Sequence, residues 1–212
     1  MIPDFIESYQ IQESDCCDNV IDWFESNKSR QERGISGSDS GKSVNTDIKD
    51  TTDISLSVVD IQLNEDMSDI FYPLFGALQY SLNEYILKYS ILQRAELHIS
   101  PRFNIQRYTK GQHFKYPHYE SSSFYKRKRI LTWMIYLNDV NKEGKTVFSY
   151  YSIETKPTKG RILLWPADFT HTHFGDIVED TKYIMTGWFD IKHPKFSEKQ
   201  YKDIDIRYFN IL

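Results

Sequence analysis

A histidine and a glutamate lie two positions apart in the segment His118-Tyr119-Glu120. Successive side chains of a strand point to opposite faces, so positions 118 and 120 can point to the same side if this segment is extended. A histidine from a later strand would complete a two-histidine, one-carboxylate face, which holds iron(II) and leaves other coordination positions open. The candidate for that ligand is His173, so His118, Glu120 and His173 are the predicted metal-binding and catalytic residues.

A second histidine competes for the third ligand position. The sequence T-H-T-H places His171 and His173 on one face if the strand is regular. An H-x-E pair alone is weak support for a metal site, because a chain with six histidines can contain such a pair by chance. We interpret the other histidines as structural or exposed, namely His98, His113 and His193.

The first 94 residues are expected to form helices that support a later β-rich body. Apolar residues recur every three or four positions within 2–27 and again within 67–92, where Pro73 interrupts the pattern near its start. Such spacing predicts one apolar helix face in each segment. Residues 28–53 are polar and rich in Gly, Ser and Asp, so we predict a mobile loop there.

Short strand-like runs follow over residues 95–192, separated by breaks that contain Gly, Pro, Asn or Lys. The runs are AELHIS, FNIQRYT, ILTWMIYLND, KTVFSYYS, GRILLWP and KYIMTGWFDI. Their intervals are typical of sandwiches and jelly rolls. The sequence therefore predicts one α+β, mostly β domain over residues 1–212, with 193–212 as a C-terminal extension.

Composition argues against several classes of partner. The net charge is −4, so the chain lacks the overall basic field that sequence-independent nucleic-acid binding requires. No apolar run approaches the ~20 residues of a membrane span, and no signal peptide is recognisable. The adjacent Cys16 and Cys17 are poorly placed to bond to each other, and the chain has no further cysteine. We expect a soluble, cytoplasmic protein with no membrane partner.

Three segments between about residues 98 and 190 resemble the prolyl-4-hydroxylase-like branch of the 2-oxoglutarate- and Fe(II)-dependent dioxygenases. They are FNIQRYTKGQHFKYPHYES, RILTWMIYLNDVNKEGKTVFSYY and KGRILLWPADFTHTHFGDIVEDTKYIMTGWF. The resemblance implies a double-stranded β-helix, the jelly-roll fold also found in cupins, with N-terminal supporting helices. It also implies Fe(II), 2-oxoglutarate and O2 as metal and cosubstrates, and makes ascorbate a candidate further cofactor.

The resemblance selects four residues that are expected to bind the cosubstrate. A tyrosine lies ten positions before the first ligand in such enzymes, which is Tyr108 here, and another lies in an I-Y-L-N strand, which is Tyr136. The cation expected to pair with the distal carboxylate of 2-oxoglutarate is Lys182, nine positions after His173. The tryptophan expected six positions further on is Trp188, which the resemblance assigns to a pocket wall. A lysine among apolar strand residues is costly unless an anion or an ordinary salt bridge satisfies it.

Two positions depart from the family pattern. Most members carry aspartate where this chain has Glu120, whose additional methylene moves the carboxylate roughly 1 to 1.5 Å from the expected place. The usual G-G-E-T turn is E-G-K-T at residues 143–146, with Lys145 in the acidic position. The resemblance therefore does not extend to the length of the carboxylate ligand or to this turn at the expected substrate entrance. Residues 121–129, SSSFYKRKR, form either a cover over the site or a solvated turn.

The resemblance implies hydroxylation of a C–H bond with decarboxylation of 2-oxoglutarate to succinate. A proline-containing peptide is the first expected substrate, and a free amino acid or another small molecule is equally compatible. Oxidative halogenation is disfavoured because it generally requires halide in place of the carboxylate ligand, here Glu120. A catalytically weakened, cupin-like binding or structural protein is the main rival, and nucleic-acid demethylation would need a basic channel near 126–129.

Overall fold

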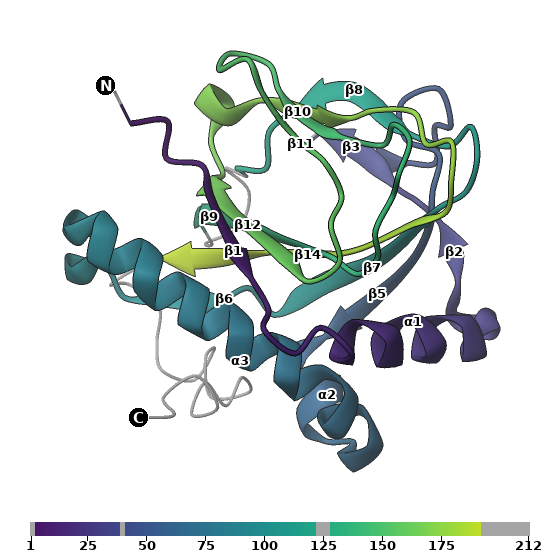
Figure 1. The fold of residues 1–212 in the computed structure, drawn as a ribbon, viewed down its shortest axis with the longest axis horizontal. Helices are drawn as coiled ribbons and strands as arrows, with labels where there is room; N and C mark the ends of the chain where they lie inside the picture. The colour runs from purple at the N-terminus through teal and green to yellow at the C-terminus, as the bar shows by residue number, and fades with distance from the viewer. Residues whose placement is uncertain (1–2, 39–40, 122–127, 192–212) are drawn as a thin grey trace.

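The computed structural model describes residues 3–38, 41–121 and 128–191, which form a helical layer, a large sheet and a small sheet (Figure 1). The predicted C-terminal extension and most of the predicted cover over the site lie outside these residues. No helix within the described ranges is long and apolar enough to cross a membrane. The α-helices are α1 (Cys16–Ser26), α2 (Val58–Gln62) and α3 (Glu65–Lys88).

The large sheet has eight strands in the order β1-β12-β9-β14-β7-β5-β2, with β6 paired to β14. Neighbouring strands are antiparallel throughout. The strands are β1 (Glu7–Gln10), β2 (Glu32–Arg33), β5 (Thr52–Ser57), β6 (Leu97–Ile99), β7 (Arg102–Tyr108), β9 (Lys128–Tyr136), β12 (Arg161–Pro166) and β14 (Lys182–Ile191).

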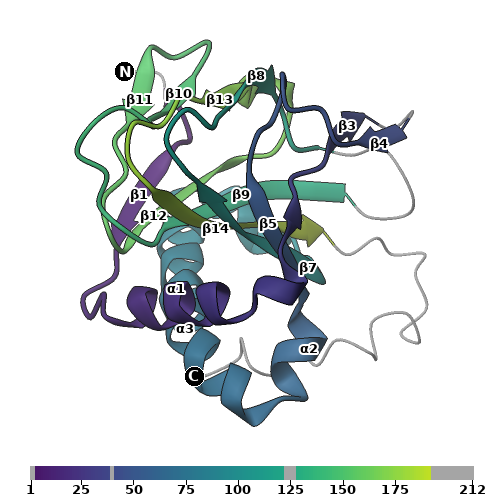
Figure 2. The same cartoon turned by 90° about the vertical axis from the view of Figure 1, so that its right-hand side faces the viewer.

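The small sheet has four strands in the order β11-β10-β13-β8, and β3 (Ser36–Ser38) pairs with β4 (Gly41–Ser43) in a separate two-stranded sheet. From β7 onward the chain passes repeatedly between the two sheets, which is the winding of a double-stranded β-helix. Figure 2 shows the helices against the face of the large sheet that points away from the small sheet. The predicted fold class is therefore confirmed. The strands are β8 (Phe114–His118), β10 (Thr146–Phe148), β11 (Ile153–Thr155) and β13 (His173–Gly175).

Strand alternation divides the core into two parts. Trp133 and Ile135 of β9 pack with the helices, in a cluster that includes Phe71 of α3. Met134 and Tyr136, on the opposite face of β9, belong to a second cluster between the two sheets. Because neighbouring side chains of a strand point to opposite faces, one strand contributes to both cores. The cluster between the sheets is the one that adjoins the candidate site.

The polar segment 28–53 contains more regular structure than its composition predicts. Strand β2 pairs with β5, and β5 pairs along its length with β7 at the edge of the large sheet. A salt bridge between Lys49 and Asp53, 2.6 Å long and largely buried, supports this edge. Backbone pairing with an existing sheet supplies the order that apolar burial does not. The prediction of a loop throughout this segment is therefore wrong.

The predicted division into helices first and strands later is also too simple. Strand β1 lies within the segment expected to be helical and pairs with the edge strand β12, with Glu7 opposite Leu164. Helix α1 starts only at Cys16. The first 94 residues thus contribute three strands to the large sheet as well as the supporting helices. The long helix predicted within 67–92 is confirmed as α3.

Candidate metal centre

Two histidines face each other across neighbouring strands of the small sheet. His118 ends β8, His173 begins β13, and their Cα atoms are partners in the antiparallel register. Their ring centroids lie 4.5 Å apart. Nδ1 of His118 lies 2.9 Å from the backbone oxygen of Tyr116, and Nδ1 of His173 lies 2.9 Å from that of His171. Because Nδ1–H donates to this oxygen, Nε2 keeps the lone pair that can bind a metal.

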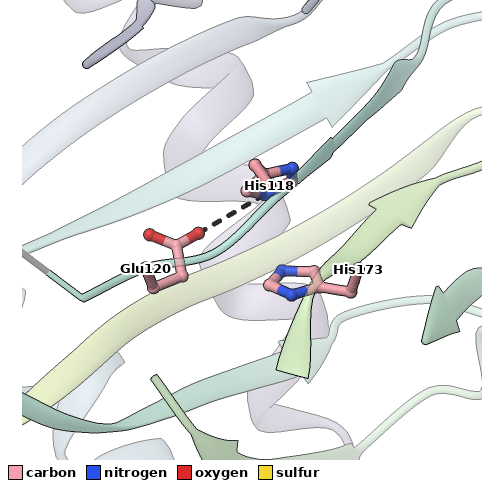
Figure 3. Close-up of side chains that lie close together, drawn as sticks. All are labelled: His118, Glu120 and His173. Atoms are coloured by element: carbon pink, nitrogen blue, oxygen red, sulfur yellow. Dashed lines mark ion pairs between the residues drawn. The ribbon is translucent and has the colours of Figure 1, made fainter. Parts of the chain in front are cut away.

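Glu120 reaches the histidines from beyond the end of β8. Its N–H and that of Ser121 both donate to the backbone oxygen of Ala167, at 3.0 and 2.6 Å. Glu120 Oε1 lies 3.5 Å from Nε2 of His118. Figure 3 shows His118, Glu120 and His173 grouped together, and their possible ligand atoms lie within 4.8 Å of one another. The structure therefore groups the three predicted ligands. The expected strand alternation does not orient Glu120, however, because β8 ends at His118.

Aromatic side chains enclose the two imidazoles. Phe114 stacks on His118 with a centroid distance of 3.8 Å, and Trp165 lies edge-on to His173 at 5.0 Å. Burial and the neighbouring charge of His118 lower the pKa of His173 to about 4. His173 is therefore neutral at pH 7, which is the form that ligates a metal.

The carboxylate is charged at the same pH. Burial alone would raise the pKa of Glu120, but the hydrogen bond with His118 and the charges of His118, His173 and Arg129 outweigh it and lower this pKa to about 2. One ionised carboxylate beside two imidazoles is a donor set suited to a divalent first-row metal such as iron(II). The residues present thus fit the expected metal.

His171 lies outside this group. It belongs to a short 3-10 turn, η3 (Phe169–His171), so the T-H-T-H segment is not a regular strand. Its Nε2 lies 2.8 Å from the backbone oxygen of Asp4, and its Nδ1 lies 2.8 Å from Thr170 Oγ1. Both ring nitrogens are therefore occupied within the protein. The contribution of His171 to the site is its backbone oxygen, which orients His173.

Lys182 is a buried cation at the start of β14. Its side chain is only 2% exposed, and Nζ donates to the backbone oxygen of Gly144 at 2.9 Å. It lies 4.4 Å from the ring centroid of Tyr108, its partner residue on β7. Burial lowers the pKa of Lys182 to about 8, against an opposing effect of Asp176. Among the described residues no carboxylate pairs with it, so an ordinary salt bridge does not account for this lysine.

The two predicted tyrosines are buried close to this interior. The Tyr136 hydroxyl donates to Thr146 Oγ1 at 2.7 Å, and the Tyr108 hydroxyl donates to Gln106 Oε1 at 3.2 Å. Burial raises the pKa of both hydroxyls, so both remain protonated donors at neutral pH. The sequence did not predict the roles of Thr146 and Gln106, since each is one polar residue in a strand and carries no spacing signal.

Trp188 does more than line the interior. Its Nε1 donates to Glu120 Oε2 at 3.1 Å, and the guanidinium of Arg129 stacks over its ring at 3.5 Å from the centroid. Sequence reasoning missed Arg129 because it ends the basic run that was considered a cover or a turn. Arg129 lies opposite Asp190 on β14, a pairing that only the structure reveals.

A double-stranded β-helix with two histidines and one carboxylate grouped on its small sheet has the fold and donor set of a non-haem iron oxygenase. Residues 103–190, which span nearly all of β7 to β14, match the family model described as the 2OG-Fe(II) oxygenase superfamily. Over these residues the chain matches this superfamily of iron-binding, 2-oxoglutarate-dependent dioxygenases. A comparison with curated protein sequences finds no match.

Several solved structures share the fold at low sequence identity. A viral collagen prolyl hydroxylase from Paramecium Bursaria Chlorella virus-1, solved with 2OG, is 16% identical with a TM-score of 0.61, covering 88% of this chain and 96% of the other. A Pseudomonas putida prolyl-4-hydroxylase is 13% identical with a TM-score of 0.63, covering 88% and 93%. A Trichoplax adhaerens prolyl hydroxylase in complex with a hypoxia inducible factor peptide fragment is 17% identical with a TM-score of 0.67, covering 88% and 84%. These likenesses establish the fold only.

Proposed function

We propose that this chain hydroxylates a C–H bond of its substrate with one atom of O2, while the other atom enters succinate as 2-oxoglutarate loses CO2. The observation that carries the proposal is that a group of metal-ligand residues and a buried cation both adjoin one interior cluster, and that this cation has no carboxylate partner in the described part of the chain. Trp165, beside His173, and Tyr108, beside Lys182, belong to that cluster. A dicarboxylate chelating the metal at one end and reaching a cation at the other suits this arrangement.

Each proposed site residue has a separate task. Nε2 of His118, Nε2 of His173 and one oxygen of Glu120 would hold the iron, and Lys182 would pair with the distal carboxylate of 2-oxoglutarate. When bound, the iron and 2-oxoglutarate supply the oxidising chemistry. The surrounding aromatic side chains exclude water and fix the ligand rings.

The hydroxyls of Tyr108 and Tyr136 are the proposed donors to the same distal carboxylate. Both are protonated, and both belong to the interior cluster between the sheets. Each hydroxyl would turn from its present partner, Gln106 or Thr146, toward the anion. Hydrogen bonds to a charged acceptor are stronger than those to a neutral one, which favours this exchange.

A proline-containing peptide is the proposed substrate. The three neighbours described above are prolyl hydroxylases by title, and one of them is in complex with a peptide fragment. Two exposed aromatic side chains lie close to the ligands in the sequence. Tyr119 stands between His118 and Glu120. Phe169 lies two residues after Ala167, and the backbone oxygen of Ala167 accepts the hydrogen bond from the Glu120 N–H. Exposed aromatic rings are suitable surfaces for proline-rich segments. A small-molecule substrate is the alternative.

The proposal is tested by incubating the purified protein with Fe(II), 2-oxoglutarate, ascorbate, O2 and a set of prolyl peptides or small metabolites. Succinate formation coupled to a substrate mass increase of one oxygen atom is the expected result, with His173→Ala as the inactive control. Binding of metal and 2-oxoglutarate without any turnover across the whole set would instead indicate the weakened binding protein, for which the replacement of aspartate by Glu120 is the supporting observation.

A further inference from the structure

The two carboxylate oxygens of Glu120 have different partners. Oε1 lies 3.5 Å from Nε2 of His118, whereas Oε2 accepts a hydrogen bond from Trp188 Nε1 at 3.1 Å. Nη1 of Arg129 lies 3.6 Å from the same Oε2 and donates to the Glu120 backbone oxygen at 3.1 Å. One oxygen thus faces the histidines, and the other faces Trp188 and Arg129.

Arg129 and Trp188 also support each other. The guanidinium lies 3.5 Å from the centroid of the Trp188 ring, which is a stacked cation–π contact. Arg129 lies in β9 and Trp188 in β14, two directly paired strands of the large sheet. Glu120 lies outside any strand. Side chains on a rigid sheet therefore hold a ligand that itself lies outside the sheet.

We propose that Arg129 and Trp188 form a clamp that positions the longer Glu120 side chain as a one-oxygen ligand of the metal. The inference rests on the proposed function. Glutamate has one more rotatable bond than aspartate, so more side-chain freedom must be lost when it binds a metal. The clamp fixes Oε2 and so directs Oε1 toward the histidines. Arg129 and Trp188 are positioning residues in this scheme.

Binding of Co(II) under anaerobic conditions tests the clamp without requiring turnover. Trp188→Phe removes the N–H donor and keeps a ring, and Arg129→Met removes the charge and the donors but keeps an unbranched chain. Partners of metal ligands typically contribute 10- to 100-fold in affinity, so each variant should weaken Co(II) binding by about that factor. The visible Co(II) spectrum should change as well, because a loosened carboxylate alters the ligand geometry.

A matched control lies on the helix-facing side of the large sheet. Arg107 is 5.6 Å above the Phe24 ring and 2.7 Å from a carboxylate oxygen of Glu25. Arg107→Met removes the same kinds of contact and should leave Co(II) affinity unchanged. Thermal unfolding checks that each variant folds. If Arg129→Met does not fold, Arg129→Lys keeps the charge, loses the planar fork and provides the same comparison.

A double-mutant cycle with Glu120→Asp separates the clamp from general destabilisation. Removing one methylene shortens the side chain by roughly 1.5 Å, so the aspartate cannot reach the clamp and the histidines together. Arg129→Met should therefore cost much less Co(II) affinity in the Glu120→Asp background than in the wild type. Equal losses in the two backgrounds, or wild-type affinity in both Arg129→Met and Trp188→Phe, would overturn the clamp. Undiminished Co(II) binding by His118→Ala would overturn the metal site itself.

Discussion

Replacing Lys182 with methionine should stabilise the protein while weakening its affinity for 2-oxoglutarate. The folded-state pKa of Lys182 is about 8, below its ordinary 10.5, so the folded chain binds fewer protons than the unfolded chain between these pH values. The free energy of unfolding therefore rises with pH across this window. Below pH 8 the full cost of burying the charged lysine applies, about 3 kcal/mol. Loss of the hydrogen bond to Gly144 offsets about 1 kcal/mol or more of the gain.

The net expectation for Lys182→Met at pH 7 is a gain of about 1–2 kcal/mol, or roughly 2–8 °C in Tm for a chain of this size. The cosubstrate shows the opposite effect. Truncating one partner of a buried charge pair typically costs about 2–5 kcal/mol, which is roughly 30- to 5,000-fold in affinity. Binding of 2-oxoglutarate should also weaken in the wild type as the pH rises above 8, because the lysine loses its charge.

The assay is urea and thermal unfolding of both proteins at pH 7 and pH 10.5, with Mn(II) and with or without 2-oxoglutarate. Wild type should gain stability from 2-oxoglutarate, and Lys182→Met should gain little. The stability difference between the ligand-free proteins should shrink at the higher pH, where the folded lysine is neutral and most of the cost of burying its charge is lost. A variant that is less stable than wild type at pH 7 and binds 2-oxoglutarate equally well would refute the reasoning.

Three further predictions follow from the same structure. His173→Ala should abolish Mn(II) binding in a calorimetric titration while His171→Ala retains it, and the reverse result would mean that the ligand is misassigned. Because the folded pKa of His173 is about 4 against an ordinary 6.5, the metal-free protein should lose up to about 3 kcal/mol of stability as the pH falls from 6.5 to 4. In urea denaturation, His173→Phe should flatten the pH dependence of the unfolding free energy between pH 6.5 and 4. An unchanged pH dependence would contradict the assignment of this loss to His173. Gly187→Ala should destabilise by about 1–3 kcal/mol because its Cβ would lie 2.4 Å from the Trp133 ring, whereas Gly76→Ala in α3, with nothing within 4 Å of its Cβ, should gain up to about 1 kcal/mol in chemical denaturation.

Each of the six apolar runs predicted after residue 95 contains a strand, and all but one of these strands belong to the large sheet. The sequence predicted them because a strand of a central sheet needs apolar residues on both faces. The small sheet was mostly missed. Its strands have three to five residues, too few to show a period, and β8 contains Pro117. These short strands are ordered by the larger sheet opposite them, a contact that local sequence does not encode.

The ligand positions were easier to predict than their supports. Spacing identified His118, Glu120 and His173, and the structure groups these three side chains. The orientation of Glu120 depends on backbone bonds to Ala167 and on Trp188, which lie far away in the sequence. Arg129 was missed for the same reason, since its contact with Glu120 depends on how β9 and the end of β8 meet in space.

The distribution of ionisable groups over the two faces of β14 connects the fold with the site. Tyr183, Met185 and Phe189 face the helices in an apolar core. Lys182 and Trp188 lie on the other face, where one carries a buried charge and the other binds the candidate carboxylate ligand. A core selected for stability alone would be apolar on both faces, because burying an unpaired charge is unfavourable. The buried charge of Lys182 supports the proposed anion site, and a stabilised Lys182→Met variant would show that the folded protein gives up stability to keep this lysine.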